Sequence, residues 1–385
     1  MRSEWKIRKI SDIAEVNPRE SIRKGSIAKK IPMDVLQPFT RDVPSYQMEE
    51  YKGGTKFRNM DTIMARITPC LENGKIAQVR CLNNKEVGFG STEYIVFRAK
   101  AGTDPDYLYY LIRSPLVRDP AIKSMVGSSG RQRVQTSVVS NLQIAVPDYK
   151  EQIKIGELLR ELDDKIEINN QINKNLLEQA QALYKDRFVD LRPFNGEMPA
   201  DWHLGTVSEI IELHDSKRIP LSSRERANLA KIYPYYGATS VMDYVDRYLF
   251  DGIYLLLGED GTVVDSKGFP ILQYVEGKFW VNNHAHIITG KNGFTVETLY
   301  LMFSLTNVQS IVTGAVQPKI SQANLNKVPV VIPSEAELSD FDSIVQPIFA
   351  QIRNLRAEND RLFATRDTLL PRLMSGEIDV SHLDL

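Results

Sequence analysis

Residues 5–16 read WKIRKISDIAEV and residues 202–213 read WHLGTVSEIIEL, so one stretch of the chain returns 197 residues later. Four of the twelve aligned positions are identical and four more exchange similar residues, where ordinary residue usage predicts about one identity by chance. Because self-similarity at a fixed spacing indicates a duplicated architecture, we interpret the rest of the chain as two copies of one unit.

Further matches keep the same order along the chain, with offsets that drift as loop lengths change. Residues 72–75 match 259–262, residues 106–109 match 297–300, and residues 133–147 match 319–333. Within the copies, β-rich runs at 94–97 and 286–288 predict strands, and short helices are expected to start near Ser11, Asp106, Ser208 and Glu297.

Each copy is followed by the pattern of a long amphipathic helix. Capping boxes directly after a proline, at residues 148–151 and 334–337, mark the two starts. From there residues recur at the 4-3 spacing of a coiled-coil seam, and each helix is expected to be about 60 Å long. The apolar seam positions are Ile155, Leu159, Leu162, Ile166, Leu176, Ala180 and Leu183 in the first helix and Val345, Ile348, Ile352, Leu355, Leu362, Leu369 and Leu373 in the second. Asn169, Asn173, Asn359 and Arg366 fall on the same seam.

An apolar stripe of this length needs a partner, and the other helix of the same chain, folded back antiparallel, can supply it. Homodimerisation through each helix is the alternative. Pro347 and Pro371 lie inside the second pattern and should kink or end it, so we expect one continuous first helix and a bent or shortened second one.

The predicted fold class is therefore α+β. Two tandem mixed α/β domains are each followed by a long helix, and the two helices pair as an antiparallel coiled coil. The expected boundaries are 1–148 and 191–333 for the domains, and 149–190 and 334–385 for the helical spacers.

The net charge of −1 conceals an uneven distribution. Residues 1–148 hold 24 Lys and Arg against 16 Asp and Glu, whereas residues 334–385 hold 5 against 10. The second copy, residues 191–333, holds 12 against 14 and is not net basic. A basic domain suits phosphate contacts, although a solvated charged surface is the ordinary alternative.

Composition and motifs exclude several other classes. The chain contains neither a leader-like apolar run at its start nor about 18 consecutive apolar residues, so we expect a cytoplasmic location. The two cysteines, Cys70 and Cys81, are too few for a disulfide framework. Phosphate-binding loops, metalloprotease motifs and nucleophile elbows do not occur in the sequence, so we expect no catalytic residues.

Two polar groups could suggest metal or acid-base chemistry. His284 and His286 alternate as on a strand and could share one face, while the carboxylates of Glu259-Asp260 and Asp163-Asp164 come in pairs. Without a cysteine or a third histidine nearby, we interpret the histidines as surface or hydrogen-bonded residues. The first carboxylate pair sits in a Gly-flanked turn and the second on a charged helix face, so we interpret both as structural and expect no metal site.

Taken together, the sequence resembles the specificity subunit of Type I restriction-modification systems over essentially its whole length. Five stretches carry the resemblance, and they are specific in combination: residues 5–16, 88–94, 235–238, 243–245 with 258–261, and 369–378. The resemblance implies a non-catalytic subunit that reads DNA with two target-recognition domains. It further implies assembly with two methyltransferase subunits and with motor-nuclease subunits, so that S-adenosylmethionine, ATP and Mg are expected on those partners and no cofactor on this chain.

Arg, Lys, Gln, Thr and Tyr side chains in the loops of each copy are the candidates for contact with double-stranded DNA. Arg and Gln can bond bidentately to guanine or adenine, whereas phosphate contacts set only position and register, and each copy should supply both kinds of contact. The candidates are Lys52, Lys56, Arg58, Arg66, Thr68, Lys75, Arg131, Gln132 and Arg133 in the first copy, and Lys217, Arg218, Tyr235, Tyr236, Lys267, Gln317 and Lys319 in the second.

Because the two copies differ in sequence, we expect an asymmetric bipartite target with an unread spacer whose length the helices fix. Off-seam apolar residues of the first helix, Ile153, Ile168, Ile172, Leu177 and Tyr184, could dock the methyltransferase subunits or add intramolecular packing. Two other functions remain open at this stage: a stand-alone tandem-domain DNA-binding regulator, and a coiled-coil scaffold without a DNA role.

Overall fold

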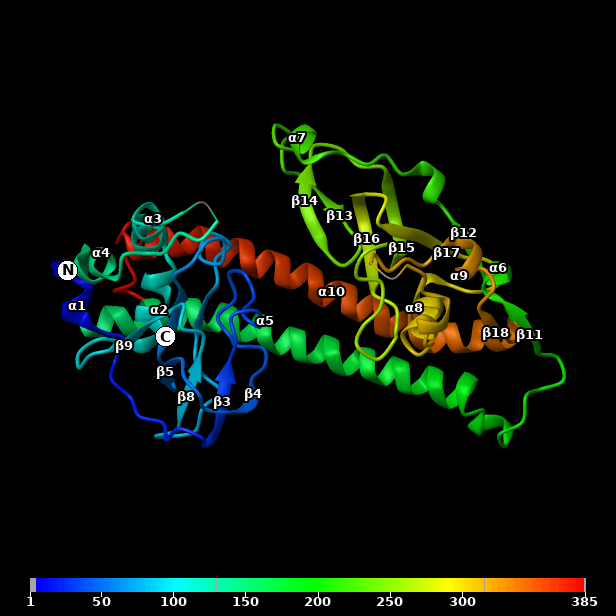
Figure 1. The fold of residues 1–385 in the computed structure, drawn as a ribbon, viewed down its shortest axis with the longest axis horizontal. Coiled ribbons are helices and arrows are strands. Elements are labelled where there is room, and N and C mark those ends of the chain that lie inside the picture. Colours follow the sequence, from blue (N-terminus) through cyan, green and yellow to red (C-terminus); the bar gives the residue numbers. More distant parts are fainter. Residues whose placement is uncertain (1–4, 129, 315, 384–385) are drawn as a thin grey trace. The chain divides into compact units, whose positions relative to one another are not determined.

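The computed structural model describes residues 5–128, 130–314 and 316–383, and its contacts divide the chain into two compact units. Unit 1 comprises Met1–Asn169 and Glu358–Leu385, and unit 2 comprises Asn170–Ala357. Each unit contains short strands, short helices and part of two long helices, α5 (Tyr149–Tyr184) and α10 (Glu335–Met374) (Figure 1).

Unit 1 contains a sheet in the order β2-β9-β6-β7, a second in the order β4-β3-β8-β5, and the antiparallel pair β1-β10. Its strands are β1 (Lys6–Lys9), β2 (Ala14–Val16), β3 (Ile27–Ile31), β4 (Gln47–Glu50), β5 (Thr55–Arg58), β6 (Thr62–Ala65), β7 (Ile76–Gln78), β8 (Val87–Gly90), β9 (Tyr94–Ala99) and β10 (Gln143–Val146). Its short helices are α1 (Ile10–Ile13), α2 (Pro105–Arg113), α3 (Pro115–Lys123) and α4 (Thr136–Asn141).

Unit 2 contains a sheet in the order β12-β17-β15-β16-β13-β14 and the antiparallel pair β11-β18. Its strands are β11 (His203–Thr206), β12 (Ile211–Leu213), β13 (Tyr233–Tyr236), β14 (Val241–Val245), β15 (Phe250–Gly258), β16 (Leu272–Val281), β17 (Ala285–Gly290) and β18 (Pro329–Ile332). Its short helices are α6 (Val207–Ile210), α7 (Ser223–Arg226), α8 (Val296–Ser304) and α9 (Gln322–Leu325). Single helical turns lie at η1 (Lys185–Val189), η2 (Arg192–Phe194), η3 (Asp215–Lys217) and η4 (Gln309–Ile311).

The two units share one topology, which confirms the predicted duplication. The order β2-β9-β6-β7 in unit 1 corresponds to β12-β17-β15-β16 in unit 2. The long strand β15 corresponds to the two shorter strands β5 and β6 of unit 1, and the long strand β16 corresponds to β7 and β8. In addition, β3 pairs parallel with β8 in unit 1, and β13 pairs parallel with β16 in unit 2. The predicted α+β fold class is therefore confirmed.

The sequence match between residues 72–75 and 259–262 is wrong, because these residues do not occupy equivalent places in the two units. Ala65 and Gly258 end corresponding strands, and each donates its backbone N–H across the following connection, to Lys75 and Ile271 respectively. Residues 72–75 therefore correspond to the stretch just before Ile271 and not to residues 259–262. The match arose because both connections contain a turn with a glycine, whose φ is positive in each case.

The helix that follows the central sheet is capped in the same way in both units. Asp104 accepts a hydrogen bond from the backbone of Tyr107 at the start of α2, and Thr295 accepts one from Thr298 at the start of α8. The two helices begin 191 residues apart, as the sequence match at residues 106–109 and 297–300 predicts. Local capping thus fixes equivalent helices on equivalent sheets.

The long helix α10 is continuous through both prolines, so the expectation of a shortened second helix is wrong. A proline inside a helix removes one backbone hydrogen bond and costs about 3 kcal/mol. Val345 and Phe349, on either side of Pro347, are buried in the core of unit 2, and this packing offsets the local cost. Pro371 lies within one turn of the end at Met374.

No helix of the described residues is both long and apolar enough to cross a membrane.

Both long helices contribute to the core of each unit. In unit 1, Ile155 and Leu159 of α5 join Leu370 and Leu373 of α10 in the core around α2. In unit 2, Ala180 and Tyr184 of α5 pack with Phe341 and other apolar residues of α10.

Burial along the predicted seam varies. Ile155, Leu159, Ile166, Val345, Ile352 and Leu355 are buried, and Leu162, Leu176, Ile348, Leu362 and Leu369 are partly buried. Leu183 differs from the prediction, because it is 40% exposed whereas Tyr184 is 7% exposed. Beyond Ala180 the buried positions recur every fourth residue, at Tyr184 and Phe188, so the heptad spacing no longer applies there.

Candidate nucleic-acid interface

In unit 1 a short hairpin, residues 126–133, is fixed to the segment that follows β6; we call it hairpin 1. Val126 and Arg133 exchange two backbone hydrogen bonds of 3.0 and 2.9 Å. Arg133 also pairs with Ile67, and the backbone N–H of Thr68 donates to the Gln132 carbonyl at 3.0 Å. Ser129 lies outside the described residues. The predicted candidates Thr68, Gln132 and Arg133 are thus brought together at the base of this hairpin.

Unit 2 contains the same arrangement in residues 313–319, which we call hairpin 2. Thr313 and Lys319 exchange backbone hydrogen bonds of 2.8 and 2.7 Å, and Lys319 also pairs with Asp260 after β15. The backbone N–H of Gly261 donates to the Pro318 carbonyl at 2.9 Å. Ala315 lies outside the described residues. Lys319 therefore occupies the place of Arg133, as the 186-residue offset predicts.

The side chains at the two hairpin bases carry different charges. In unit 1 the Arg133 guanidinium lies 3.0 and 2.6 Å from the Glu93 carboxylate, and this hydrogen bond holds the pKa of Glu93 below its ordinary value. Arg66 donates to the Val134 carbonyl at 3.2 Å. Arg131 is exposed on the hairpin itself. The unit 1 site is therefore basic, with one carboxylate holding Arg133.

A polar hollow of about 470 Å³ lies beside this site in unit 1. Two predicted residues, Lys56 and Arg66, line it together with Arg19, which the sequence reasoning missed. Arg19 directly follows Pro18 in a loop after β2. A basic residue in a proline-containing loop is the sequence signal that could have identified it as a DNA-contact candidate. The hollow is lined by Asn17, Pro18, Arg19, Glu20, Gly54, Thr55, Lys56, Arg66, Thr92 and Tyr94.

Three other predicted residues of unit 1 have side-chain partners outside hairpin 1. Lys52 is largely exposed and lies 3.4 Å from Glu50. Arg58 pairs with Glu20 at 2.7 Å, so it reaches the rim of the hollow. Lys75 donates to the Met33 carbonyl at 2.9 Å and is partly buried.

In unit 2, the candidates Arg218 and Lys319 share one carboxylate, that of Glu259. Arg218 Nη1 lies 2.5 Å and Lys319 Nζ 3.2 Å from the Glu259 oxygens. Burial alone would raise the pKa of Glu259, but the hydrogen bond from Arg218 and the surrounding positive charges outweigh it and lower that pKa. The two basic side chains are therefore oriented by Glu259 and partly neutralised by it.

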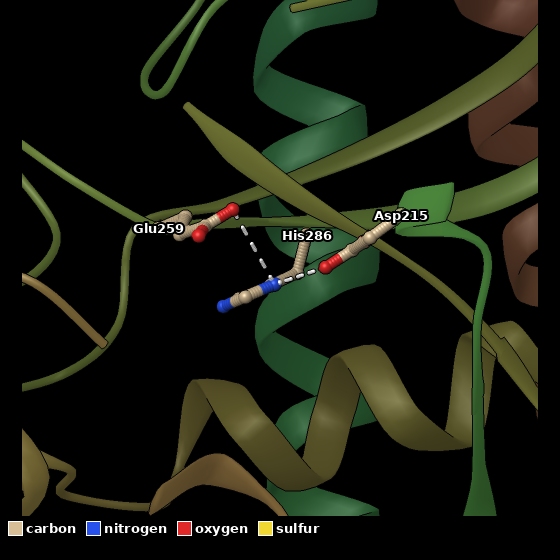
Figure 2. A group of neighbouring side chains, drawn as sticks. All are labelled: Asp215, Glu259 and His286. Carbon is tan, nitrogen blue, oxygen red and sulfur yellow. Dashed lines mark hydrogen bonds and ion pairs between the residues drawn. The ribbon is translucent and has the colours of Figure 1, made fainter. Parts of the chain in front are cut away.

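His286 lies behind this pair, fully buried between two hydrogen-bond acceptors. Its Nδ1 lies 2.6 Å from Asp215 Oδ2, and its Nε2 lies 2.8 Å from the Ile320 carbonyl. Figure 2 shows the imidazole between the carboxylates of Asp215 and Glu259. Both ring nitrogens of His286 therefore have oxygen partners. His286 thus ties the end of hairpin 2 to Asp215.

Asp215 is the most connected acceptor of this group. It also accepts hydrogen bonds from Gln322 Nε2 at 2.5 Å and from the Ile287 backbone at 2.9 Å. Burial would raise the pKa of Asp215, but the hydrogen bonds from His286 and Gln322 lower it overall.

Asp215, Glu259 and His286 place potential ligand atoms within 4.8 Å of one another, which makes them a candidate metal site by distance. The positive charges of Arg218 and Lys319 already balance the two carboxylates, and both ring nitrogens of His286 have partners. A divalent cation would have to displace these cations. The cluster therefore fits an ion-pair network and does not fit a metal site.

The remaining candidates of unit 2 are dispersed. Tyr235 differs most from the prediction: it is 1% exposed, with its hydroxyl bonded to Leu221 and Arg226 stacked on its ring, so it cannot offer that ring to a duplex. Tyr236 is partly buried against Phe279. Gln317 is exposed on hairpin 2, Lys217 is exposed directly before Arg218, and Lys267 is exposed in a turn between β15 and β16.

Comparison with known proteins points to one family. The family model described as the Type I restriction modification DNA specificity domain matches residues 2–178 and 199–360. The Type I restriction enzyme MjaIX specificity subunit of Methanocaldococcus jannaschii is 26% identical over 312 residues, which cover 74% of this chain and 71% of the relative. The HindI specificity subunit of Haemophilus influenzae is 23% identical, with 88% of this chain and 89% of the relative covered.

A solved structure shares the fold. The crystal structure of a Type I restriction-modification system S subunit from M. genitalium superposes with a TM-score of 0.54 at 17% identity, and the match covers 97% of this chain and 96% of that one. The two family matches to this chain are separated by residues 179–198, which include the end of α5 and the turn η1.

Proposed function

Because this chain belongs to the family of Type I restriction-modification DNA specificity subunits, we propose that hairpin 1 and hairpin 2 each read one half of an asymmetric, bipartite DNA target. The chain has two recognition domains and works as the DNA specificity subunit of a Type I complex.

One observation carries this proposal. Both units hold a hairpin in the same backbone frame, on the segment after β6 or β15, yet they present different side chains there. Arg131, Gln132 and Arg133 in unit 1 are replaced by Gln317, Pro318 and Lys319 in unit 2. A conserved frame with exchanged side chains suits two half-sites of different sequence, since Arg bonds to guanine and Gln to adenine in the major groove.

Phosphate contacts are assigned to the basic side chains around each hairpin. In unit 1 these are Lys56 and Arg66 at the hollow, together with Arg19. Unit 2 is not net basic, and Glu259 partly neutralises Arg218 and Lys319. We therefore expect unit 2 to depend less on salt-sensitive phosphate contacts than unit 1 does.

We assign catalysis to partner subunits. Two methyltransferase subunits would hold S-adenosylmethionine and methylate adenine, and motor-nuclease subunits would hold ATP and Mg. Exposed apolar side chains on α5, Ile168 at 51% and Ile172 at 39% exposure, are the candidates for methyltransferase docking. Tyr184 is buried and is not available for that role. Acting on DNA inside the cell, such a complex would work in the cytoplasm.

The test is to map methylated adenines in a genome that expresses this chain with a partner methyltransferase subunit. The parent should give one bipartite motif. Arg131→Ala with Gln132→Ala should relax one half-site, and Gln317→Ala should relax the other, each by a factor of roughly 5 to 150 at the affected position. Arg8→Ala, which removes an exposed arginine of β1, is the matched control and should leave the motif intact. If the hairpin variants leave both half-sites unchanged, the hairpins do not read the bases.

A further inference from the structure

Buried polar residues lie on the seam between α5 and α10 in unit 1, where apolar residues would pack best. Asn169, Asn359 and Arg366 fall on the heptad positions and are 0%, 5% and 1% exposed. Asp163, next to the seam, is 4% exposed. These four residues form two pairs between the helices.

The first pair joins Asp163 of α5 to Arg366 of α10. Arg366 Nη1 lies 2.5 Å from Asp163 Oδ1, and the other carboxylate oxygen accepts a hydrogen bond from the Tyr110 hydroxyl at 2.6 Å. Arg366 also donates to the Phe39 carbonyl at 3.1 Å and to Asp367 at 3.0 Å. Both charged groups thus have partners. Removing Arg366 would leave the Asp163 carboxylate buried without its opposite charge, whereas removing Asp163 would leave Arg366 with only the half-exposed Asp367.

The second pair joins Asn169 of α5 to Asn359 of α10. Asn169 Nδ2 lies 2.9 Å from Asn359 Oδ1 and 2.9 Å from Glu358 Oε2. Lys165, one turn earlier on α5, lies 3.7 Å from Glu358. A buried asparagine on a helical seam specifies how two helices align, because its amide is satisfied only opposite a polar partner.

Both pairs belong to one antiparallel alignment. Asn169 lies six residues after Asp163 on α5, and Asn359 lies seven residues before Arg366 on α10. The apolar seam repeats every seven residues, so by itself it would also accept a shift of one heptad. The polar pairs would not accept such a shift. If α10 moved by one heptad in one direction, Asp163 would face Leu373, and if it moved in the other direction, Asn169 would face Ile352.

We propose that Asp163–Arg366 and Asn169–Asn359 are a register lock, which allows only one alignment of α5 with α10. On the proposed function, the lock determines specificity, because a single alignment admits a single spacer length between the half-sites. The predicted effect on DNA spacing rests on the proposed function, whereas the alignment of the two helices can be measured without DNA.

The alignment is tested by cross-linking the full chain after Cys70 and Cys81 are replaced by serine. Lys165→Cys with Glu358→Cys reports the native alignment to a short bismaleimide, and Lys165→Cys with Thr365→Cys reports a shift of one heptad. The parent should cross-link only the first pair. The fourfold variant Asp163→Leu, Asn169→Leu, Asn359→Leu, Arg366→Leu should cross-link both, because replacing buried polar pairs with apolar residues generally preserves folding. Asn169→Leu with Asn359→Leu is a milder variant and should show the same change to a smaller extent.

The DNA consequence is tested by mapping methylated adenines with the same variants, without the added cysteines, and a partner methyltransferase subunit. The half-sites should stay the same, while a second spacer length, about three base pairs different, appears beside the first. If the variants retain only the native cross-link, the lock is refuted. A shifted cross-link with one unchanged spacer length refutes its role in specificity. If the parent methylates no bipartite site, the proposed function is contradicted, but the cross-linking result still tests the alignment of α5 with α10.

Discussion

Arg133 and Glu93 form a two-point ion pair at the base of hairpin 1, with guanidinium nitrogens 3.0 and 2.6 Å from the carboxylate. Arg133 is the last residue of hairpin 1 and Glu93 precedes β9, so the pair fixes the direction of a side chain that we assign to base reading. A fixed arginine selects a base edge better than a free one does, because less conformational freedom is lost on binding.

Glu93→Gln is expected to weaken discrimination while strengthening non-specific binding. The variant releases Arg133 and adds one net positive charge, so the affinity of the assembled complex for random-sequence DNA should rise. The preference for the cognate target should fall by roughly tenfold. Competition binding at two salt concentrations measures both effects. Glu72→Gln makes the same charge change at an exposed position, and equal behaviour of the two variants would show that only net charge matters.

His286→Leu is expected to destabilise unit 2 by about 3 kcal/mol, since it leaves the buried Asp215 carboxylate without its main partner. The backbone at Ile320 also loses the donor that holds the end of hairpin 2. Calorimetry should show a lower melting temperature for unit 2, and hydrogen exchange should accelerate around residues 313–322. His284→Leu, on the neighbouring and more exposed histidine, is the control. An unchanged exchange rate near Ile320 would contradict the anchoring role of His286.

The stability of unit 2 should also depend on pH through Asp215. Burial opposes ionisation of this carboxyl, but the hydrogen bonds from His286 and Gln322 lower its pKa overall. A carboxyl whose pKa is lower in the folded state stabilises the fold above its unfolded pKa of about 3.9, and this contribution is lost as pH falls through the folded value. The difference in melting temperature between the parent and Asp215→Asn should therefore be full at pH 7 and shrink below pH 4. A difference that does not change with pH would show that Asp215 acts through packing alone.

Much of the fold followed from local patterns. The repeated stretch at residues 5–16 and 202–213 forms the same strand, short helix and strand in both units, since alternation and capping act over a few residues. The 186-residue offset also placed Lys319 at the position of Arg133. The repeated stretch and this offset are both short-range sequence patterns that the two copies have kept.

Other features depend on contacts between distant segments. Asp215 and His286 are 71 residues apart and meet only because η3 follows β12, which pairs with β17. Tyr235 was expected at the DNA, but its strand β13 lies between β14 and β16, and this placement turns the ring into the core. Pro347 was expected to kink or end the second helix, but α10 continues past it, and the burial of Val345 and Phe349 in the core of unit 2 offsets the local cost.

Val380→Asp is expected to destabilise unit 1 by about 3 kcal/mol or more. Val380 is fully buried in the core of unit 1, and Ile378 packs against the same core. An unpaired carboxylate placed there has no hydrogen-bonding partner to compensate its burial. Limited proteolysis should cleave unit 1 faster while the unit 2 fragments persist. Ser381→Asp is the matched control, because its side chain is exposed one residue further along.

Insertion of one heptad into both α5 and α10 is expected to change the spacer and not the half-sites. Seven residues add about 10 Å of helix, which corresponds to about three base pairs of duplex. The insertions are best placed after Asn170 and before Ala357, so that the locked pairs Asp163–Arg366 and Asn169–Asn359 both remain within unit 1.

The inserted variant should also bind its new target less tightly than the parent binds its own. Three base pairs turn the duplex by about 100°, whereas a heptad turns the helix face by only about 20°. The DNA must therefore twist for both half-sites to be read, and that deformation weakens binding. Methylation mapping gives the spacer, and competition binding gives the affinity. Insertion into α5 alone is the control, since it leaves the two helices mismatched and should abolish bipartite methylation. A changed half-site sequence, with the spacer retained, would show that the helices do not measure the spacer.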